Sequence, residues 1–397
     1  MQKIVGMAAG VGLVLSSITL GSVTANAEQA DGPTVSGTVH RQDGTAFRAG
    51  TPVALFATER EDEAGPSPVG ASSSATPVAS GTVGASGSFS LTVSDVQAVR
   101  GAADPGGVVD LEVRAVDGSE YAPFAMSRKV VERGDTIELR DPSTDAASAR
   151  SAVEHPEPVS MTATSTVSSP ADVGMAVLPS TSRAASDQPT PFTQICGETK
   201  TKNLGQRRVL VGATYGVAPY TNGRFTYKNG ATSNLGVVFS ANAKKGSWSK
   251  AGTSSRSSTS TIDYGARYGG TAYYTYFTYG QYAQWCRPLG SSQNRVYNHV
   301  VRATGYAGGS QVASAPVPAA SRCTPFANGT TITTDTTAAN TWEQAVNFLG
   351  PLGVTLTAKT GWSASASMSY LNKSGSTKRI CGTKGNWGAA PERAVTK

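Results

Sequence analysis

The stretch GGTAYYTYFTYGQYAQWC, residues 269–286, holds seven of the 29 aromatic residues of the chain (14 Tyr, 10 Phe and 5 Trp). They form two interleaved sets: Tyr274, Tyr276 and Tyr282 share one parity, and Tyr273, Phe277, Tyr279 and Trp285 share the other. Alternation of this kind is typical of a β-strand, whose side chains point to opposite faces in turn. A strand with aromatic residues on both faces is either buried between two layers, or packed on the core with one face and on a ligand with the other.

A second stretch, LGVTLTAKTGWSASASMSY at 352–370, alternates even more strictly. Beyond its Lys-Thr-Gly turn, Trp362, Met368 and Tyr370 share one face with two alanines, and four serines occupy the other face. Residues 235–249, LGVVFSANAKKGSWS, resemble the first part of this stretch. We therefore predict a duplicated unit, in which each copy is a β-hairpin that turns at Lys-x-Gly and returns through Trp248 or Trp362.

Short alternating runs rich in Gly, Ser and Thr recur along the chain, whereas helix-period patterns are scarce. This composition predicts an all-β protein with an N-terminal β-sandwich, a disordered linker and a C-terminal β-rich domain built from two related hairpin units. With 397 residues, the chain is long enough for two or more domains.

The first 27 residues, with Lys3, a long apolar run and an Ala25-Asn26-Ala27 ending, match a secretory signal peptide cleaved after Ala27. A retained membrane anchor is the alternative. We expect residues 28–397 to be secreted into the extracellular space as a soluble protein. No later apolar run reaches the ~20 residues that a spanning helix needs.

Four cysteines, Cys196, Cys286, Cys323 and Cys381, lie in the C-terminal half. An even number of cysteines in an exported chain favours two disulfides, and the simplest pairing is Cys196–Cys286 with Cys323–Cys381, although three pairings exist. A zinc site is the alternative, but the sequence has no C-x-x-C pair and only His299 in this half. We expect no metal and no cofactor.

Charge divides the chain at residue 190. Residues 28–190 hold 11 basic and 22 acidic residues, a net charge of −11, whereas residues 191–397 hold 22 basic and 5 acidic residues, a net charge of +17. All five Trp and 13 of the 14 Tyr belong to the basic half. The asymmetry indicates that the basic half meets an anionic partner or the acidic half itself; a role in solubility alone is the simpler alternative.

The expected domains are an acidic β-sandwich at 28–140 and a basic, aromatic-rich β domain at 191–397. Between them, residues 141–190 are rich in Ser, Thr, Ala and Pro, which predicts a flexible linker, with a short strand around 158–166 as an alternative.

Three runs within 33–140 carry a family resemblance: Ser36-Gly-Thr-Val39, Val53-Ala-Leu-Phe56 and Gly87-Ser-Phe-Ser-Leu91. This region resembles the carboxypeptidase-regulatory-like, transthyretin-type β-sandwich, a module found in stalks and accessory domains of secreted proteins. The resemblance covers about a quarter of the chain. It implies a spacer or docking role without catalytic residues.

Signals for enzymatic chemistry are almost absent from the sequence. The motifs G-x-S-x-G, H-E-x-x-H, G-x-x-x-x-G-K-[ST] and G-x-G-x-x-G do not occur in a fitting context. The basic half has five carboxylates, at Glu198, Asp263, Asp335, Glu343 and Glu392, and none of them form a close pair along the chain. We therefore expect a non-catalytic protein, without assigned catalytic residues.

The sequence favours a secreted binding protein whose basic half holds an anionic or carbohydrate polymer of a cell surface or matrix. Lys and Arg supply a salt-sensitive attraction, and Trp and Tyr stack on sugar rings. The candidate binding residues are Trp248, Trp362, Tyr273, Tyr276, Lys244, Lys245, Lys250, Lys359, Lys378 and Arg379. Nucleic acid is an alternative anionic partner, without a recognition motif.

Two other classes of function stay open. A membrane-acting, pore-forming-like protein would insert Ser/Thr-rich alternating hairpins, and residues 361–371 are just long enough for the ~9–11 residues of a spanning strand. A secreted enzyme or inhibitor is the remaining alternative.

Overall fold

The computed structural model describes ten segments of the chain, and Gly32–Lys397 forms one compact unit. The described residues are 32–60, 67–134, 136–142, 158–175, 194–240, 249–334, 341–348, 354–361, 366–382 and 395–397. The signal peptide predicted at 1–27 lies outside them. The described part is nearly all β, as the sequence predicts. No helix within it is long and apolar enough to cross a bilayer.

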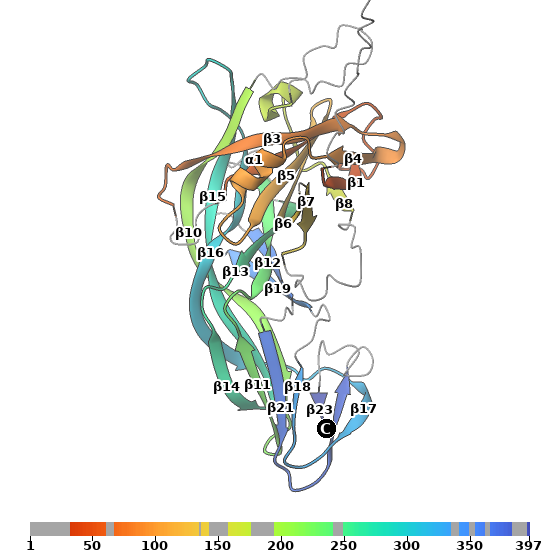
Figure 1. Cartoon of the computed structure of the whole chain (residues 1–397), viewed down its shortest axis with the longest axis vertical. Coiled ribbons are helices and arrows are strands. Elements are labelled where there is room, and N and C mark those ends of the chain that lie inside the picture. The colour runs from red at the N-terminus through yellow and green to blue at the C-terminus, as the bar shows by residue number, and fades with distance from the viewer. Residues whose placement is uncertain are drawn as a thin grey trace, which may run out of the picture. The chain divides into compact units, whose positions relative to one another are not determined.

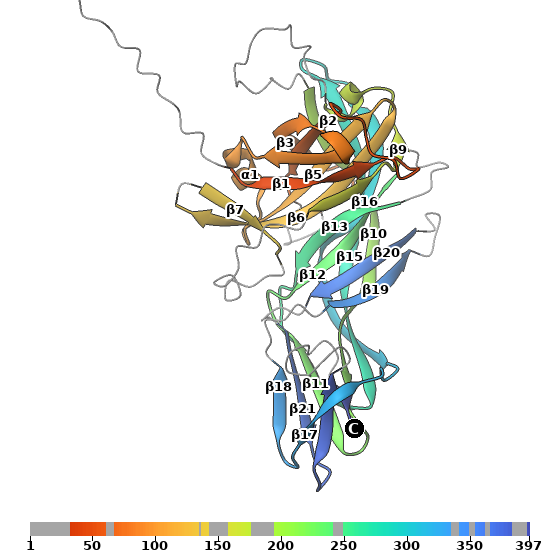
Figure 2. The same cartoon turned by 90° about the vertical axis from the view of Figure 1, so that its right-hand side faces the viewer.

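A β-sandwich occupies the N-terminal part of the described chain (Figure 2). One layer is a three-stranded sheet in the order β4–β1–β8, formed by Ser88–Thr92, Thr34–His40 and Val159–Thr162. The other layer contains β2 (Pro52–Thr58), β3 (Ser72–Thr82), β5 (Val108–Asp117) and β6 (Glu120–Arg133). Apolar side chains of both layers form one buried core, in which Val39, Leu55 and Val113 are fully buried.

Three short helices and two further short strands complete this region. Helix α1 (Val96–Ala102) begins at Asp95, whose carboxylate accepts a hydrogen bond from the amide of Ala98. The others are the 3₁₀ helices η1 (Ala85–Gly87) and η3 (Pro170–Val173), and the strands β7 (Thr136–Arg140) and β9 (Ser165–Thr166), which both pair with β6.

Residues 158–175 are not a linker. Strand β8 runs parallel to β1, and Val159 and Met161 lie in the sandwich core. Further along, Val173 and Met175 pack in a second cluster that contains Cys196 and Cys286. Apolar residues recur here at every second position, so this segment buries enough surface to be ordered. The rest of the predicted 141–190 linker, 143–157 and 176–190, lies outside the described residues.

Three long strands form the backbone of the C-terminal half (Figure 1). Strand β15 (Gly270–Pro288, 19 residues) lies between β10 (Gln194–Tyr215, 22 residues) and β16 (Arg295–Ser314, 20 residues), antiparallel to both. The aromatic stretch 269–286 therefore lies on the central strand. Tyr273, Phe277 and Tyr279 are fully buried, and Tyr274 and Tyr282 of the other parity are also buried, so most of these rings belong to the core.

Nine strands close into one barrel-like sheet that both halves of the chain share. The order is β15–β16–β12–β13–β6–β5–β2–β3–β10, and pairing of β10 with β15 closes the ring. Strands β12 (Thr232–Ser240) and β13 (Ser249–Ser257) belong to the basic half, and β13 pairs with β6 while β10 pairs with β3. The acidic and basic regions are therefore joined by backbone hydrogen bonds, and the 141–190 segment does not separate two independent sheets.

A smaller, four-stranded sheet has the order β14–β11–β21–β18. Its strands are β14 (Ile262–Tyr268), β11 (Thr221–Tyr227), β21 (Ala366–Asn372) and β18 (Thr331–Thr334). On β21, Met368 and Tyr370 are buried and Ser367 and Ser369 are half-buried. This arrangement agrees with the predicted apolar and serine faces of the stretch. Nearby are β17 (Ser321–Phe326), β22 (Lys378–Gly382) and β23 (Val395–Thr396).

The predicted hairpin repeat is not seen as two equivalent copies. Strands β12 and β13 pair antiparallel, and the predicted turn between them, with Trp248, lies outside the described residues. Strand β20 (Val354–Gly361), however, pairs with β19 (Thr341–Phe348) and β12, whereas β21 pairs with β11 and β18. The two strands of the second copy thus belong to different sheets, because each finds its hydrogen-bonding partners elsewhere in the chain.

Both predicted disulfides form, Cys196–Cys286 and Cys323–Cys381. Each joins two residues that lie directly opposite each other, Cys196 and Cys286 on β10 and β15, and Cys323 and Cys381 on β17 and β22. Each bridge therefore locks the register of one strand pair.

Candidate binding surface

Four of the predicted binding residues, Lys244, Lys245, Trp248 and Trp362, lie outside the described residues. The backbone of Lys250 is on β13 opposite Val238, and the backbone of Lys359 is on β20 opposite Asn234. The structure places the remaining four, Tyr273, Tyr276, Lys378 and Arg379, with their side chains. These four do not form a single cluster.

Tyr273 is a core residue, so the prediction that it contacts a ligand is wrong. Its side chain is fully buried, its hydroxyl shares a 2.7 Å hydrogen bond with Thr214, and its ring stacks on Phe225 at 5.2 Å. Burial raises the pKa of its hydroxyl. The ring therefore presents no surface to an external polymer; its parity faces the core.

Tyr276 has the other parity and is half-buried on the opposite face of β15. Its hydroxyl donates a 3.1 Å hydrogen bond to Oε1 of Gln311, which also accepts one of 3.1 Å from the exposed Arg208. The Arg208 guanidinium lies 4.3 Å from the ring centroid of Tyr274. Three strands, β10, β15 and β16, thus contribute to one small polar and aromatic platform.

Lys378 and Arg379 lie at the start of β22, beside a group of residues that the sequence did not single out. The Lys378 ammonium is 4.4 Å from the ring centroid of Tyr220, a cation–π contact. The Lys373 amide donates to the carbonyl oxygen of Tyr220, and Asn222, two residues beyond Tyr220, pairs with Tyr268. We call Tyr220, Arg267, Tyr268, Lys373, Lys378 and Arg379 the cation–tyrosine surface.

Local hydrogen bonds hold this surface in place. The side-chain amide of Asn372 donates to the carbonyl oxygens of Phe326 and Ser376, at 2.7 and 3.0 Å, and its oxygen accepts from the amide of Ser374. This bonding shapes the turn between β21 and β22 that carries Lys373. Arg379 exchanges two 2.8 Å backbone hydrogen bonds with Lys397. The charged groups therefore extend from an ordered backbone.

The cation–tyrosine surface is basic, because no carboxylate described in the structure pairs with its cations. Within the described part of the chain, Arg267, Lys373, Lys378 and Arg379 form no ion pair, whereas Asp263 pairs with Arg224. Glu198 is buried and pairs with Arg302. These are the carboxylates of the basic half whose side chains the structure describes, and both are already neutralised.

Two tyrosines of this surface are unusually exposed. Tyr220 is 42 % exposed and Tyr268 is 47 % exposed, whereas the core tyrosines Tyr227, Tyr273 and Tyr370 are almost fully buried. The sequence carries a signal for Tyr220, because it follows Pro219 and precedes an Asn222-Gly223 pair, which are turn-forming residues. Tyr268 stands at the end of a strand, and its exposure depends on the partner strand.

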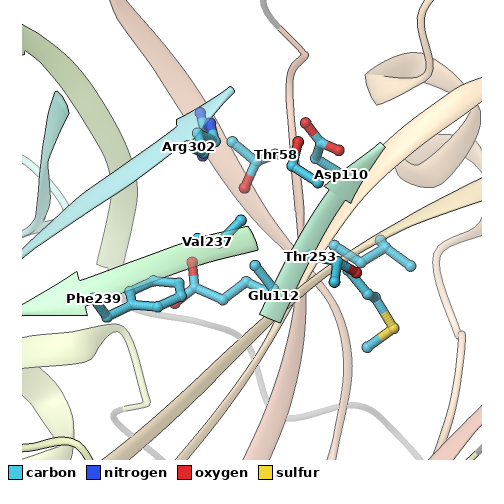
Figure 3. Close-up of a pocket in the computed structure, with 11 residues that line it drawn as sticks. Thr58, Asp110, Glu112, Val237, Phe239, Thr253 and Arg302 are labelled. Carbon is cyan, nitrogen blue, oxygen red and sulfur yellow. The ribbon is translucent and has the colours of Figure 1, made fainter. Parts of the chain in front are cut away.

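The charged residues inside the closed sheet have structural partners instead. A cavity of about 20 Å³, the room of one water molecule, is lined by Asp110, Glu112, Arg302 and neighbouring side chains (Figure 3). Asp110 is bound by Arg256 and Ser127, and Glu112 accepts hydrogen bonds from Arg114, Tyr121 and Gln284. Both carboxylates are therefore engaged in joining strands. Among the described residues, no group of three or more His, Cys, Asp or Glu side chains is arranged to hold a metal ion.

Comparison with known proteins adds no family to these observations. No family model matches the chain, and no curated protein matches it significantly. The transthyretin-type resemblance of residues 33–140 stays a prediction.

Proposed function

We propose that the chain is a secreted, non-catalytic protein that binds an anionic polysaccharide of a cell envelope or matrix through its cation–tyrosine surface. The observation that carries the proposal is the contact of Lys378 with the exposed Tyr220, beside Lys373 and Arg379, none of which forms an ion pair in the described structure. The two disulfides are compatible with an extracellular location.

The cations and the tyrosines of the surface have different physical roles in this proposal. Unpaired Lys and Arg side chains attract the repeated negative groups of a polymer, and salt screens this attraction. Exposed tyrosine rings supply flat apolar area for the faces of sugar rings, with a hydroxyl that tolerates water. Lys378 and Arg379 are consecutive on β22 and so point to opposite faces of the strand. A flexible polymer that passes over the strand end would contact both.

The acidic half supports the proposal indirectly. Its buried carboxylates Asp110 and Glu112 accept hydrogen bonds within the closed sheet, from Arg256 and Gln284 of the basic half. In the described structure, carboxylates of the acidic half form no ion pair with the cation–tyrosine surface. We therefore propose that the surface is accessible to a ligand in the folded chain.

The test is a binding screen of the intact protein against anionic and neutral polysaccharides, with nucleic acid as a third class. We expect binding to the anionic polysaccharides at low salt and its loss at high salt. Reversing both charges, with Lys378→Glu and Arg379→Glu, should weaken binding on the order of tenfold. Lys202→Glu alters an exposed lysine on β10, outside the surface, and should leave binding nearly unchanged. Binding to nucleic acid alone would contradict the proposed ligand class.

A further inference from the structure

The loop that joins β15 and β16 carries a second surface, with an apolar rather than a tyrosine-rich character. Leu289 is 71 % exposed, Val296 is 53 % exposed and Ile195, on the adjacent β10, is 38 % exposed. The register places Ile195 opposite Arg287 and Val296 opposite Trp285, so these side chains share one face of three neighbouring strands. We call Ile195, Arg287, Leu289, Arg295 and Val296 the hairpin tip.

Leu289 owes its exposure to a tight turn. The amide of Ser291 donates a 3.0 Å hydrogen bond to the carbonyl oxygen of Pro288, and Gly290 has a φ of +85°. This geometry is that of a type II turn, in which the residue before the glycine lies at the outer corner. The loop extends free of the neighbouring strands in both views (Figures 1 and 2). Leu289 therefore lies at the corner of an exposed turn.

The strands that carry the hairpin tip are held rigidly from the other face. The disulfide Cys196–Cys286 joins β10 to β15 next to Ile195 and Arg287. On the same face as the tip, the indole of Trp285 donates a 2.9 Å hydrogen bond to Thr199 and lies close above Gly197, where a Cβ atom would be 2.8 Å from the ring. A ligand would thus meet a preformed surface.

The hairpin tip is cationic as well as apolar. Arg287 lies 5.6 Å from the ring of Trp285, and Arg295 is exposed. The segments 194–199 and 285–297 contain one carboxylate, Glu198, which is buried and paired with Arg302. The surface of the tip therefore has a positive charge around three apolar side chains.

We propose that the hairpin tip docks on the surface of an anionic lipid bilayer. An exposed turn with Leu289 at its corner and a cation beside it fits a deformable, anionic lipid surface. Leu289 and Val296 would enter the interfacial region, while Arg287, on the same face as Val296, would contact lipid phosphates. This inference does not depend on polysaccharide binding, because the hairpin tip and the cation–tyrosine surface share no residue.

The test is co-sedimentation of the intact protein with vesicles of phosphatidylcholine, with and without phosphatidylglycerol. We expect binding to the vesicles that contain phosphatidylglycerol. The variant Leu289→Ser/Val296→Ser should bind at least about tenfold more weakly, since both changes remove apolar area from the contact. Val317→Ser is the matched control, because Val317 is 54 % exposed and lies outside the tip.

Two results would overturn the proposal. One is the absence of vesicle binding by the unaltered protein. The other is unchanged binding by Leu289→Ser/Val296→Ser, which would show that other cations, such as those of the cation–tyrosine surface, attract the lipid. The same variant is also tested for polysaccharide binding. We expect it to retain this binding, which shows that a loss of vesicle binding is not caused by unfolding.

Discussion

Arg256 on β13 donates two hydrogen bonds, each 3.2 Å long, to one carboxylate oxygen of Asp110 on β5. Both residues are buried, one from the basic half of the chain and one from the acidic half. Ser127 on β6 also binds Asp110, and its hydroxyl accepts a 2.8 Å hydrogen bond from the amide of Ser255 on β13. An acidic residue of one half and a basic residue of the other half thus form an ion pair inside one closed sheet.

Removing the charge of Asp110 should strongly destabilise the fold. Asp110→Asn keeps the shape of the side chain but leaves the buried Arg256 without its counter-ion, which we expect to cost about 3–5 kcal/mol in the free energy of unfolding. Asp263→Asn is the control, because Asp263 pairs with Arg224 at the surface and should contribute less than about 1 kcal/mol. Urea unfolding measures both. Equal losses in the two variants would contradict the structural role of Asp110.

The same carboxylate predicts how stability depends on pH. Burial alone would raise the pKa of Asp110, but the guanidinium groups of Arg256, Arg60 and Arg302 outweigh it and hold the pKa well below the usual 3.8. A depressed folded-state pKa stabilises the fold above the unfolded-state value, and this contribution is lost as the pH falls toward the folded-state value. We therefore expect the stability difference between the unaltered protein and Asp110→Asn to be constant near neutral pH and to shrink below about pH 4. A difference that grows in acid would contradict this sign.

Close packing at Gly212 predicts a sensitive position on β10. Gly212 lies opposite Tyr273, and a Cβ atom at Gly212 would be 2.5 Å from the ring of Phe225, which stacks on Tyr273. Gly212→Ala should therefore cost about 1–3 kcal/mol by overpacking the core. Gly305→Ala on β16 is the matched control, since its Cβ atom would be 3.5 Å from Thr278. Thermal unfolding that ranks the two variants in the reverse order would contradict the packing described.

The two disulfides should contribute similar amounts to stability. Their sequence separations are 90 and 58 residues, for which the chain-entropy model gives about 4.6 and about 4.2 kcal/mol. Replacing Cys196 and Cys286 with alanine, or Cys323 and Cys381, tests this by denaturant unfolding. Peptide mapping without reductant checks the pairing; a Cys196–Cys323 peptide would contradict the structure.

Sequence patterns predicted the parts of the fold that depend on local alternation. The all-β class, the antiparallel pairing of β12 with β13 and both disulfides agree with the structure. For the fold class and the β12–β13 pairing, neighbouring residues determine the outcome: period-two alternation decides which face is apolar, and strands adjacent in sequence pair with each other.

The closed sheet could not be predicted in the same way. Strand β5 alternates Val109, Leu111 and Val113 with Asp110 and Glu112, a pattern typical of one core face and one solvent face. The structure buries both faces, because Arg256 and Gln284 from distant strands neutralise or bind the two carboxylates. Alternation along one strand carries no information about such long-range partners. The same limit explains why β20 and β21 were expected to pair.

The candidate site was predicted only in part, for a related reason. Net charge indicated a basic half, and Lys378 and Arg379 lie on the cation–tyrosine surface. Tyr220, Tyr268 and Lys373 were not predicted, because tertiary contacts between a loop, a strand end and a turn determine their positions. Composition shows that tyrosines are abundant but does not separate the exposed ones from those in the core.

The salt dependence of polysaccharide affinity tests the central claim most directly. The measurement compares the unaltered protein, Lys378→Glu/Arg379→Glu and Lys202→Glu on one anionic polysaccharide, across a range of sodium chloride concentrations. We predict a steep loss of affinity with salt for the unaltered protein and for Lys202→Glu, and weak binding with a much shallower salt dependence for the double reversal. Identical affinity and salt dependence in all three proteins would contradict the proposed binding surface.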